Sequence, residues 1–86
     1  MARRFIIYGR TNCSFCRESI SLLSSKGEKH CFLDLTEDLQ SLNDTKAYYD
    51  WKTVPIILEN NTDTGLTNFV GGHTELTALL NSEGEQ

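Results

Sequence analysis

Two cysteines three positions apart, Cys13 and Cys16, are the residues of this sequence best suited to chemistry. They follow the apolar run Phe5-Ile6-Ile7-Tyr8 and open a stretch with helical periodicity, so we expect the first sulfur at a helix N-terminus and the second about one turn inside. Free amide N–H groups and the helix dipole favour a thiolate at that position. A thiolate attacks disulfides, and a second cysteine resolves the mixed disulfide that forms. The pair therefore predicts thiol–disulfide exchange.

The same spacing is also half of a zinc site, which leaves a second interpretation of the pair. The remaining candidate ligands are Cys31, His30 and His73, and they offer no second paired spacing. Redox chemistry is therefore favoured, and no metal ligand is assigned. An odd count of three cysteines is also unlike a small secreted disulfide scaffold. We expect Cys31 to be a buried apolar filler on a strand.

Length and composition fit one small globular domain, which we place at residues 1–82 with a C-terminal tail at 83–86. The 86 residues are 38% hydrophobic, enough for one modest core. A net charge of −4, from 8 basic and 12 acidic residues, gives no electrostatic footprint for nucleic acid or an anionic membrane. Arg3-Arg4 precedes only four apolar residues, too few for a signal peptide or a membrane span. We expect a cytoplasmic monomer with neither partner.

The apolar patterning predicts the elements that position the cysteines. We expect strands at 5–8, 29–35, 56–58 and 66–70, and helices at 14–26, from Thr36 onward, and at 73–81. Thr36 is the expected N-cap of the second helix, and Gly27 the expected C-terminal cap of the first. The predicted order is β-α-β-α-β-β-α, with a parallel pair first and an antiparallel hairpin last.

Three separated blocks then carry a resemblance to a known family: Cys13-Ser14-Phe15-Cys16, Thr53-Val54-Pro55 and Gly71-Gly72-His73-Thr74-Glu75-Leu76. Together, over nearly the whole chain, they make the sequence resemble a dithiol glutaredoxin. The resemblance implies an α/β thioredoxin-like fold with a four-stranded mixed sheet in the order 2-1-3-4. It places the first and third helices on one face of the sheet and the second helix on the other.

The resemblance also implies the roles of individual residues. Cys13 would be the nucleophile that accepts glutathione from a mixed disulfide, and Cys16 would resolve protein disulfides. The residues implied for the glutathione groove are Arg10, Lys52, Thr53, Val54, Pro55, Gly71, Gly72, Thr74 and Glu75.

Within this implied groove, the parts of glutathione are assigned to different residues. The backbone of Val54, before a cis proline, would pair with the cysteinyl part, while Thr74 and Glu75 would bind the γ-glutamyl end. Glu75 replaces the more usual aspartate. Arg10 matches a family lysine that holds the thiolate and the glycyl carboxylate, and Lys52 is a second candidate for that carboxylate.

Ser14 stands where the family's commonest motif has proline, and we expect its restored N–H to donate to the Cys13 sulfur. Some members with serine or glycine there hold a [2Fe–2S] cluster between two subunits, which is an alternative of a different class. A redoxin served by thioredoxin reductase is another, but its aromatic C-terminal motif is missing from Leu80–Gln86. The family's usual clients are glutathionylated proteins and disulfide-containing proteins such as ribonucleotide reductase.

Overall fold

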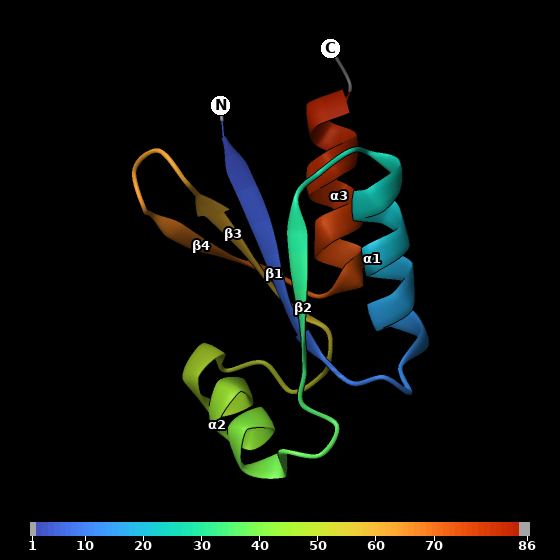
Figure 1. Cartoon of the computed structure of the whole chain (residues 1–86), viewed down its shortest axis with the longest axis vertical. Coiled ribbons are helices and arrows are strands. Elements are labelled where there is room, and N and C mark those ends of the chain that lie inside the picture. The colour runs from blue at the N-terminus through green and yellow to red at the C-terminus, as the bar shows by residue number, and fades with distance from the viewer. Residues whose placement is uncertain (1, 85–86) are drawn as a thin grey trace.

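Seven elements follow one another in the predicted order in the computed structural model, which describes residues 2–84 (Figure 1). The strands are β1 (Arg3–Gly9), β2 (His30–Asp34), β3 (Ile56–Asn61) and β4 (Thr67–Gly71). The helices are α1 (Ser14–Ser25), α2 (Leu39–Tyr49) and α3 (His73–Gly84). Each expected element is therefore present, and most of the differences lie at the ends.

The four strands form one mixed sheet in the order β2-β1-β3-β4. β1 runs parallel to β2 and antiparallel to β3, and β3 forms the predicted antiparallel hairpin with β4. This order confirms the sheet that the sequence predicted. It places the end of β1, where the cysteine loop begins, in the middle of the sheet.

The core lies on the face of the sheet that α1 and α3 cover (Figure 1). Phe5 and Ile7 of β1 are fully buried there, against Leu23 of α1 and Leu76 of α3. α2 lies across the opposite face, where the Tyr49 ring stacks on Phe69 of β4 at 5.3 Å between ring centroids. The predicted division of the helices between the two faces is confirmed.

The ends of α1 are fixed by local hydrogen bonds. Cys13 is the N-cap, with extended backbone at φ −143° and ψ 111°. At the other end Gly27 has a φ of 70°, and the Glu28 amide donates to the Leu23 carbonyl oxygen at 2.9 Å. This pattern is the left-handed helix terminus for which glycine is best suited. The predicted cap at Gly27 is confirmed.

The expected burial of Cys31 is wrong, because its side chain is exposed. β2 is an edge strand, and Cys31 pairs with Ile6 of β1. Side chains alternate along a strand, so Ile6 and Cys31 point away from the face that carries Phe5 and Ile7. Leu33, two residues further along β2, is 41% exposed on the same side. The helices α1 and α3 cover only the other face.

The expected N-cap of α2 is also wrong: the cap is Asp38, whose carboxylate accepts from the Ser41 amide at 3.0 Å. Thr36 is held elsewhere, since its hydroxyl oxygen accepts from the Thr11 amide at 2.8 Å. This tertiary contact engages the Thr36 side chain, and Asp38, which is also of a type that caps helices well, takes the position instead. The acidic Glu37 consequently lies before the helix instead of in its first turn.

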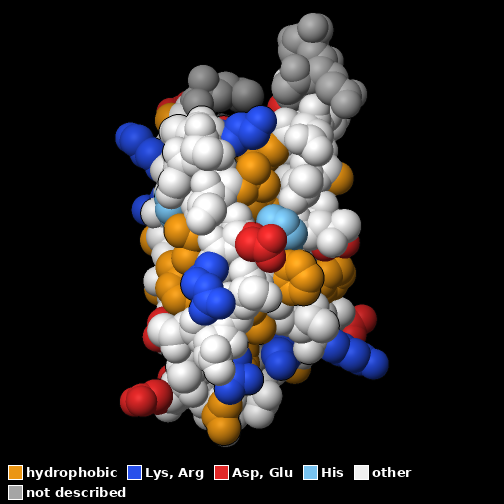
Figure 2. Space-filling view, turned by 90° about the vertical axis from the view of Figure 1, so that its right-hand side faces the viewer, with side chains coloured by type: hydrophobic (Ala, Val, Ile, Leu, Met, Phe, Trp, Pro, Cys, Tyr) orange, Lys and Arg blue, Asp and Glu red, His pale blue; other side chains and the backbone are white. Residues whose placement is uncertain are grey.

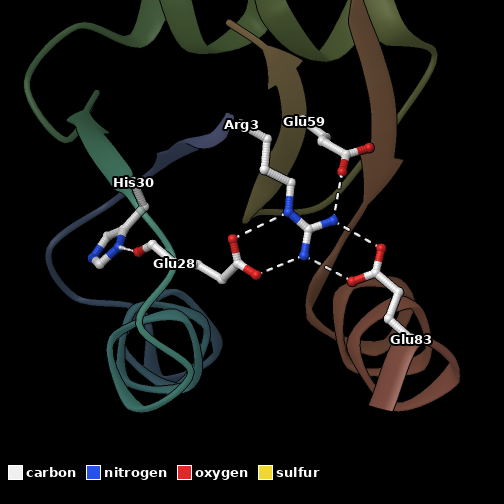
Figure 3. A network of polar contacts seen from close by, with 5 residues as sticks. All are labelled: Arg3, Glu28, His30, Glu59 and Glu83. Carbon is white, nitrogen blue, oxygen red and sulfur yellow. Dashed lines mark hydrogen bonds and ion pairs between the residues drawn. The ribbon is translucent and has the colours of Figure 1, made fainter. Parts of the chain in front are cut away.

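α3 continues to Gly84, three residues beyond the predicted end at Asn81. Its last turn is tied to the start of β1, because the Arg3 guanidinium pairs with Glu83 at 2.7 Å (Figure 3). The same guanidinium reaches Glu28 at 2.6 Å and Glu59 at 2.8 Å. The remainder of the predicted tail, residues 85–86, lies outside the described residues.

Candidate active site

The Cys13 sulfur lies at the N-terminus of α1, as predicted, and is half-buried. It accepts a hydrogen bond from the Cys16 amide at 3.2 Å. An amide donor of this kind stabilises a thiolate more than a thiol. The expected donor was wrong, however: within residues 2–84, Ser14 N–H makes no bond to this sulfur. The helix therefore supplies its donor one turn further in.

The Cys16 sulfur lies on the buried face of α1 and is fully shielded from solvent. Burial, followed by the hydrogen bond with Cys13, raises the pKa of the Cys16 thiol to about 12; the nearby charge of Arg17 acts in the opposite direction. A Cβ added to Gly9 would come within 2.6 Å of this sulfur. Glycine at the end of β1 thus makes the space that Cys16 occupies.

Hydrogen bonds to two neighbouring elements hold the loop that carries Cys13. Thr11 bonds to Thr36 in the loop after β2, through its amide at 2.8 Å and its hydroxyl at 3.1 Å. Arg17 of α1 donates to the Thr11 carbonyl oxygen at 3.1 Å. These contacts anchor the residues just before the nucleophile to two neighbouring elements.

The segment before β3 comes up against Cys13 from the other side of the site. The Val54-Pro55 peptide bond is cis, and the Cys13 sulfur lies 4.0 Å from the Val54 carbonyl oxygen. Blocks that are about forty residues apart in the sequence therefore meet at one sulfur.

A pocket of about 300 Å³ opens beside this contact. Its wall includes the following residues of the predicted groove: Thr53, Val54, Pro55, Gly72, Thr74 and Glu75. Gly71 is buried next to Gly72 at the end of β4. Arg10 and Lys52 are exposed and are absent from this wall among the described residues. A wider depression of about 1070 Å³ surrounds Arg3 and Glu28, and its wall includes neither Cys13 nor Cys16.

Glu75 folds back over the two glycines, and its carboxylate accepts from the Gly72 amide at 2.9 Å. A Cβ on Gly71 would lie 2.8 Å from Cγ of Glu75, and the φ of Gly71 is 126°. Gly71 therefore leaves the space in which the Glu75 side chain lies. The carboxylate caps the start of α3 and remains in the wall of the pocket.

Three further residues line the pocket that were not among the predicted groove residues: Phe15, Trp51 and His73. The Phe15 and His73 rings stack with centroids 5.8 Å apart. The Trp51 indole Nε1 is buried and has no hydrogen-bond partner among the described residues. Figure 2 views the side of the molecule that α1 and α3 form, where hydrophobic side chains reach the surface beside a histidine. The sequence shows that Phe15, Trp51 and His73 are aromatic, but their proximity in the pocket wall depends on how the helices pack.

The described residues contain neither a metal-binding cluster nor a membrane-spanning helix. Within residues 2–84, no group of three or more His, Cys, Asp or Glu side chains is arranged to hold a metal ion. The helices of this part of the chain are each too short or too polar to cross a membrane.

A sequence model of the glutaredoxin family matches residues 5–62 of the chain. No curated protein sequence matches it. Among solved structures, glutaredoxin 1 from Francisella tularensis, crystallised with cacodylate, matches 99% of this chain and 100% of its own, with a TM-score of 0.67 and 18% identity.

A second solved structure is G4, the poxviral disulfide oxidoreductase essential for cytoplasmic disulfide bond formation. It matches 81% of this chain and 69% of its own, with a TM-score of 0.53 and 23% identity. Likeness at these identities supports the fold, whereas the family assignment rests on the sequence model. With its paired cysteines at the start of α1, this chain belongs to the glutaredoxin family and is a thiol–disulfide oxidoreductase.

Proposed function

We propose that this glutaredoxin uses glutathione to reduce protein disulfides and glutathione mixed disulfides, through Cys13 and Cys16. The observation that carries the proposal is the contact between the Cys13 sulfur and Val54, a residue in the wall of the neighbouring pocket. The Cys13 sulfur lies 4.0 Å from the Val54 carbonyl oxygen, beside a pocket of about 300 Å³. A tripeptide bound along this wall would have its own sulfur next to Cys13.

The different environments of the two sulfurs support the following order of steps. The Cys13 thiolate attacks one sulfur of a client disulfide, the S–S bond breaks, and the departing client thiolate takes a proton from solvent. Cys16 remains a thiol meanwhile, because its pKa is raised to about 12 by burial. On losing its proton, Cys16 attacks the Cys13 sulfur, which releases the second client thiolate and leaves a Cys13–Cys16 disulfide. Two glutathione molecules reduce that disulfide and leave as glutathione disulfide.

The pocket and its rim suit the three parts of glutathione. Val54, at the segment before β3, offers backbone N–H and C=O groups to the cysteinyl part in the way that a strand edge would. Thr74 and Glu75 lie in the first turn of α3, where free amides suit the γ-glutamyl carboxylate and the Glu75 carboxylate suits its ammonium. Trp51 also lines this wall. Arg10 and Lys52 would meet the glycyl carboxylate from the exposed rim.

A reducing compartment such as the cytoplasm suits this chemistry, because Cys13, Cys16 and Cys31 are all free thiols. Glutathionylated proteins and ribonucleotide reductase are the first clients to test. Glutathione-dependent reduction of one of them would identify the class of protein disulfide that the enzyme accepts.

The test is a disulfide-reduction assay coupled to NADPH through glutathione and glutathione reductase. The variants are Cys13→Ser and Cys16→Ser, with Cys31→Ser as the matched control because that cysteine is exposed on β2. Cys13→Ser should be inactive on every substrate. Cys16→Ser should reduce small glutathione mixed disulfides and fail on protein disulfides, and Cys31→Ser should match the wild type.

A parallel assay replaces glutathione and its reductase with thioredoxin reductase. Wild-type turnover with thioredoxin reductase and none with glutathione would overturn the proposal and favour a redoxin of the other class. Retained activity in Cys13→Ser would contradict the assignment of the nucleophile.

A further inference from the structure

A buried serine joins α1 to the first residue of α3. Ser19 is fully buried, and its hydroxyl lies between two partners. On one side is the Phe15 carbonyl oxygen, at 2.8 Å, and on the other is the Nδ1 atom of His73, at 3.1 Å. Phe15 belongs to the Cys-x-x-Cys segment, whereas His73 begins the helix that carries Thr74 and Glu75. The bridge therefore links the nucleophile's helix to the ligand wall.

The hydrogen positions in this bridge follow from counting donors. A carbonyl oxygen donates nothing, and two oxygens 2.8 Å apart need a hydrogen between them, so the single Ser19 hydroxyl hydrogen points to Phe15. The contact with His73 then requires that Nδ1 carries a proton and donates to Ser19 Oγ. The other ring nitrogen, Nε2, is left for solvent or a ligand.

The two ends of the bridge also meet directly. The Phe15 and His73 rings are stacked, with an interplanar angle of 27°, and both line the pocket beside Cys13. A hydrogen bond and a ring contact thus hold the same two residues together. Phe15 is 57% exposed, whereas Ser19, which joins it to His73 by hydrogen bonds, is fully buried.

We propose that His73 is a positioning residue that fixes the distance between Cys13 and the ligand wall of α3, through Ser19 and Phe15. This inference rests on the proposed glutathione function. The Cys13 sulfur keeps its amide donor within α1 itself, from Cys16, so loss of the bridge leaves that contact in place. Ligand binding, which needs both helices in register, is the property that changes.

The kinetic test compares three variants with a matched control. His73→Phe keeps a stacking ring and loses the Nδ1 donor, Ser19→Ala removes the acceptor, and His73→Asn places an amide N–H near the Nδ1 position. Ser24→Ala, on the exposed side of α1, is the control. The first two should raise the KM for a glutathione mixed disulfide about fivefold to tenfold, the effect expected for one lost hydrogen bond. Their kcat should stay near the wild-type value, and His73→Asn and Ser24→Ala should have nearly wild-type KM.

Binding is measured separately by fluorescence, because Trp51 lies in the pocket wall and is the single tryptophan of the sequence. The Kd for glutathione should rise in the same variants as the KM. A fall in kcat as large as the rise in KM would indicate general loss of the site and overturn the inference. Equal KM values for His73→Phe and His73→Asn would overturn it as well.

Two measurements without glutathione test the bridge itself. ¹⁵N NMR of the wild type should show that Nδ1 of His73 carries a proton. In Ser19→Ala the NMR signal of the hydrogen bond from His73 Nδ1 to residue 19 should disappear. Thermal unfolding of Ser19→Ala, His73→Phe and the double variant should give a non-additive loss of Tm. A proton on Nε2 alone, or additive losses, would refute the bridge. Failure of the wild type to bind glutathione would instead overturn the proposed function, and these two measurements would still decide whether the bridge from His73 through Ser19 to Phe15 exists.

Discussion

At the scale of single residues, Cys13 and Cys16 have different chemistry although they are one helical turn apart. Cys13 is half-buried and receives an amide hydrogen bond. Cys16 is fully buried, and burial raises the pKa of its thiol to about 12. A group whose pKa is raised in this way stays protonated across the neutral range. The Cys13 sulfur is therefore available to external reagents, whereas the Cys16 sulfur is not.

This difference predicts selective alkylation of the reduced protein. At pH 7 a thiol with a pKa of about 12 is ionised in only about 1 molecule in 10⁵, and the Cys16 sulfur is also shielded. Iodoacetamide should therefore modify Cys13 and the exposed Cys31 and leave Cys16 intact. Peptide mass spectrometry gives the extent at each site, with the urea-unfolded protein as the control in which all three react. Modification of Cys16 in the folded protein as fast as Cys31 would contradict the assignment.

The residues of the site divide into those that a sequence motif identifies and those that it does not. Cys13 and Cys16 were predictable from their fixed spacing before a helix, whereas the Thr53–Pro55 segment was predictable only through the resemblance to the family. Phe15, Trp51 and His73 enter the pocket through side-chain directions that only the packing of α1 against α3 determines. From the sequence alone, His73 is most simply interpreted as a surface residue and Trp51 as a core or rim residue.

At the scale of elements, the turn from β4 into α3 is the strictest requirement of the site. Gly71 has a φ of 126°, and an added Cβ would lie 2.8 Å from Glu75 Cγ. The chain must pass this point without a side chain so that Glu75 can cap the helix through the Gly72 amide. The structure of this turn explains why glycine stands at position 71.

We expect Gly71→Ala to lower the free energy of unfolding by about 3 kcal/mol, from strained backbone and contact with Glu75. Gly27→Ala is the matched control: its φ of 70° is also left-handed, but nothing lies within 4 Å of the added Cβ. Gly27→Ala should lower the free energy of unfolding by only about 1 kcal/mol. Urea unfolding followed by Trp51 fluorescence measures both. Equal losses would show that the contact with Glu75 adds nothing to the backbone strain.

The ends of the elements were the least predictable feature at this scale. The order of strands and helices followed from apolar periodicity, which local sequence carries. The start of α2 did not, because Thr36 and Asp38 are both good caps and the bond from Thr11 engages Thr36 elsewhere. The exposure of Cys31 likewise depends on which strand lies at the sheet edge and which face the helices leave uncovered.

At the scale of the whole molecule, Arg3 connects four distant parts of the chain at the end opposite to α2 (Figures 1 and 3). Its guanidinium extends from β1 to Glu28 before β2, Glu59 on β3 and Glu83 on α3. The Arg3 side chain is only 19% exposed. Charged hydrogen bonds in such a shielded position are stronger than those of an ordinary surface pair. We therefore expect this cluster to hold the end of α3 against the sheet.

Arg3→Met should lower the free energy of unfolding at pH 7 by about 1–3 kcal/mol, since it leaves three carboxylates without their shared cation. Arg4→Met is the matched control, because Arg4 is exposed and bonds only to the Asn60 side chain, at 3.3 Å, among the described contacts. Its effect should be below about 0.5 kcal/mol. Urea denaturation of the two variants and the wild type gives the values. A loss in Arg4→Met as large as that in Arg3→Met would show that the cluster has no special role.

The difference in unfolding free energy between the wild type and Arg3→Met should also depend on pH, in a direction that the structure predicts. Hydrogen bonds from Arg3 hold the pKa of the Glu83 carboxyl below its ordinary value. A carboxyl with a lowered pKa contributes its stability above the unfolded-state value, about 4.3, and loses it as the pH falls through the folded-state value. The difference in unfolding free energy between the wild type and Arg3→Met should therefore shrink as the pH falls below the unfolded-state pKa. Glu83 is 42% exposed, so solvent screening keeps its share of the change small. A difference that stayed constant or grew on acidification would contradict this account of how α3 is held.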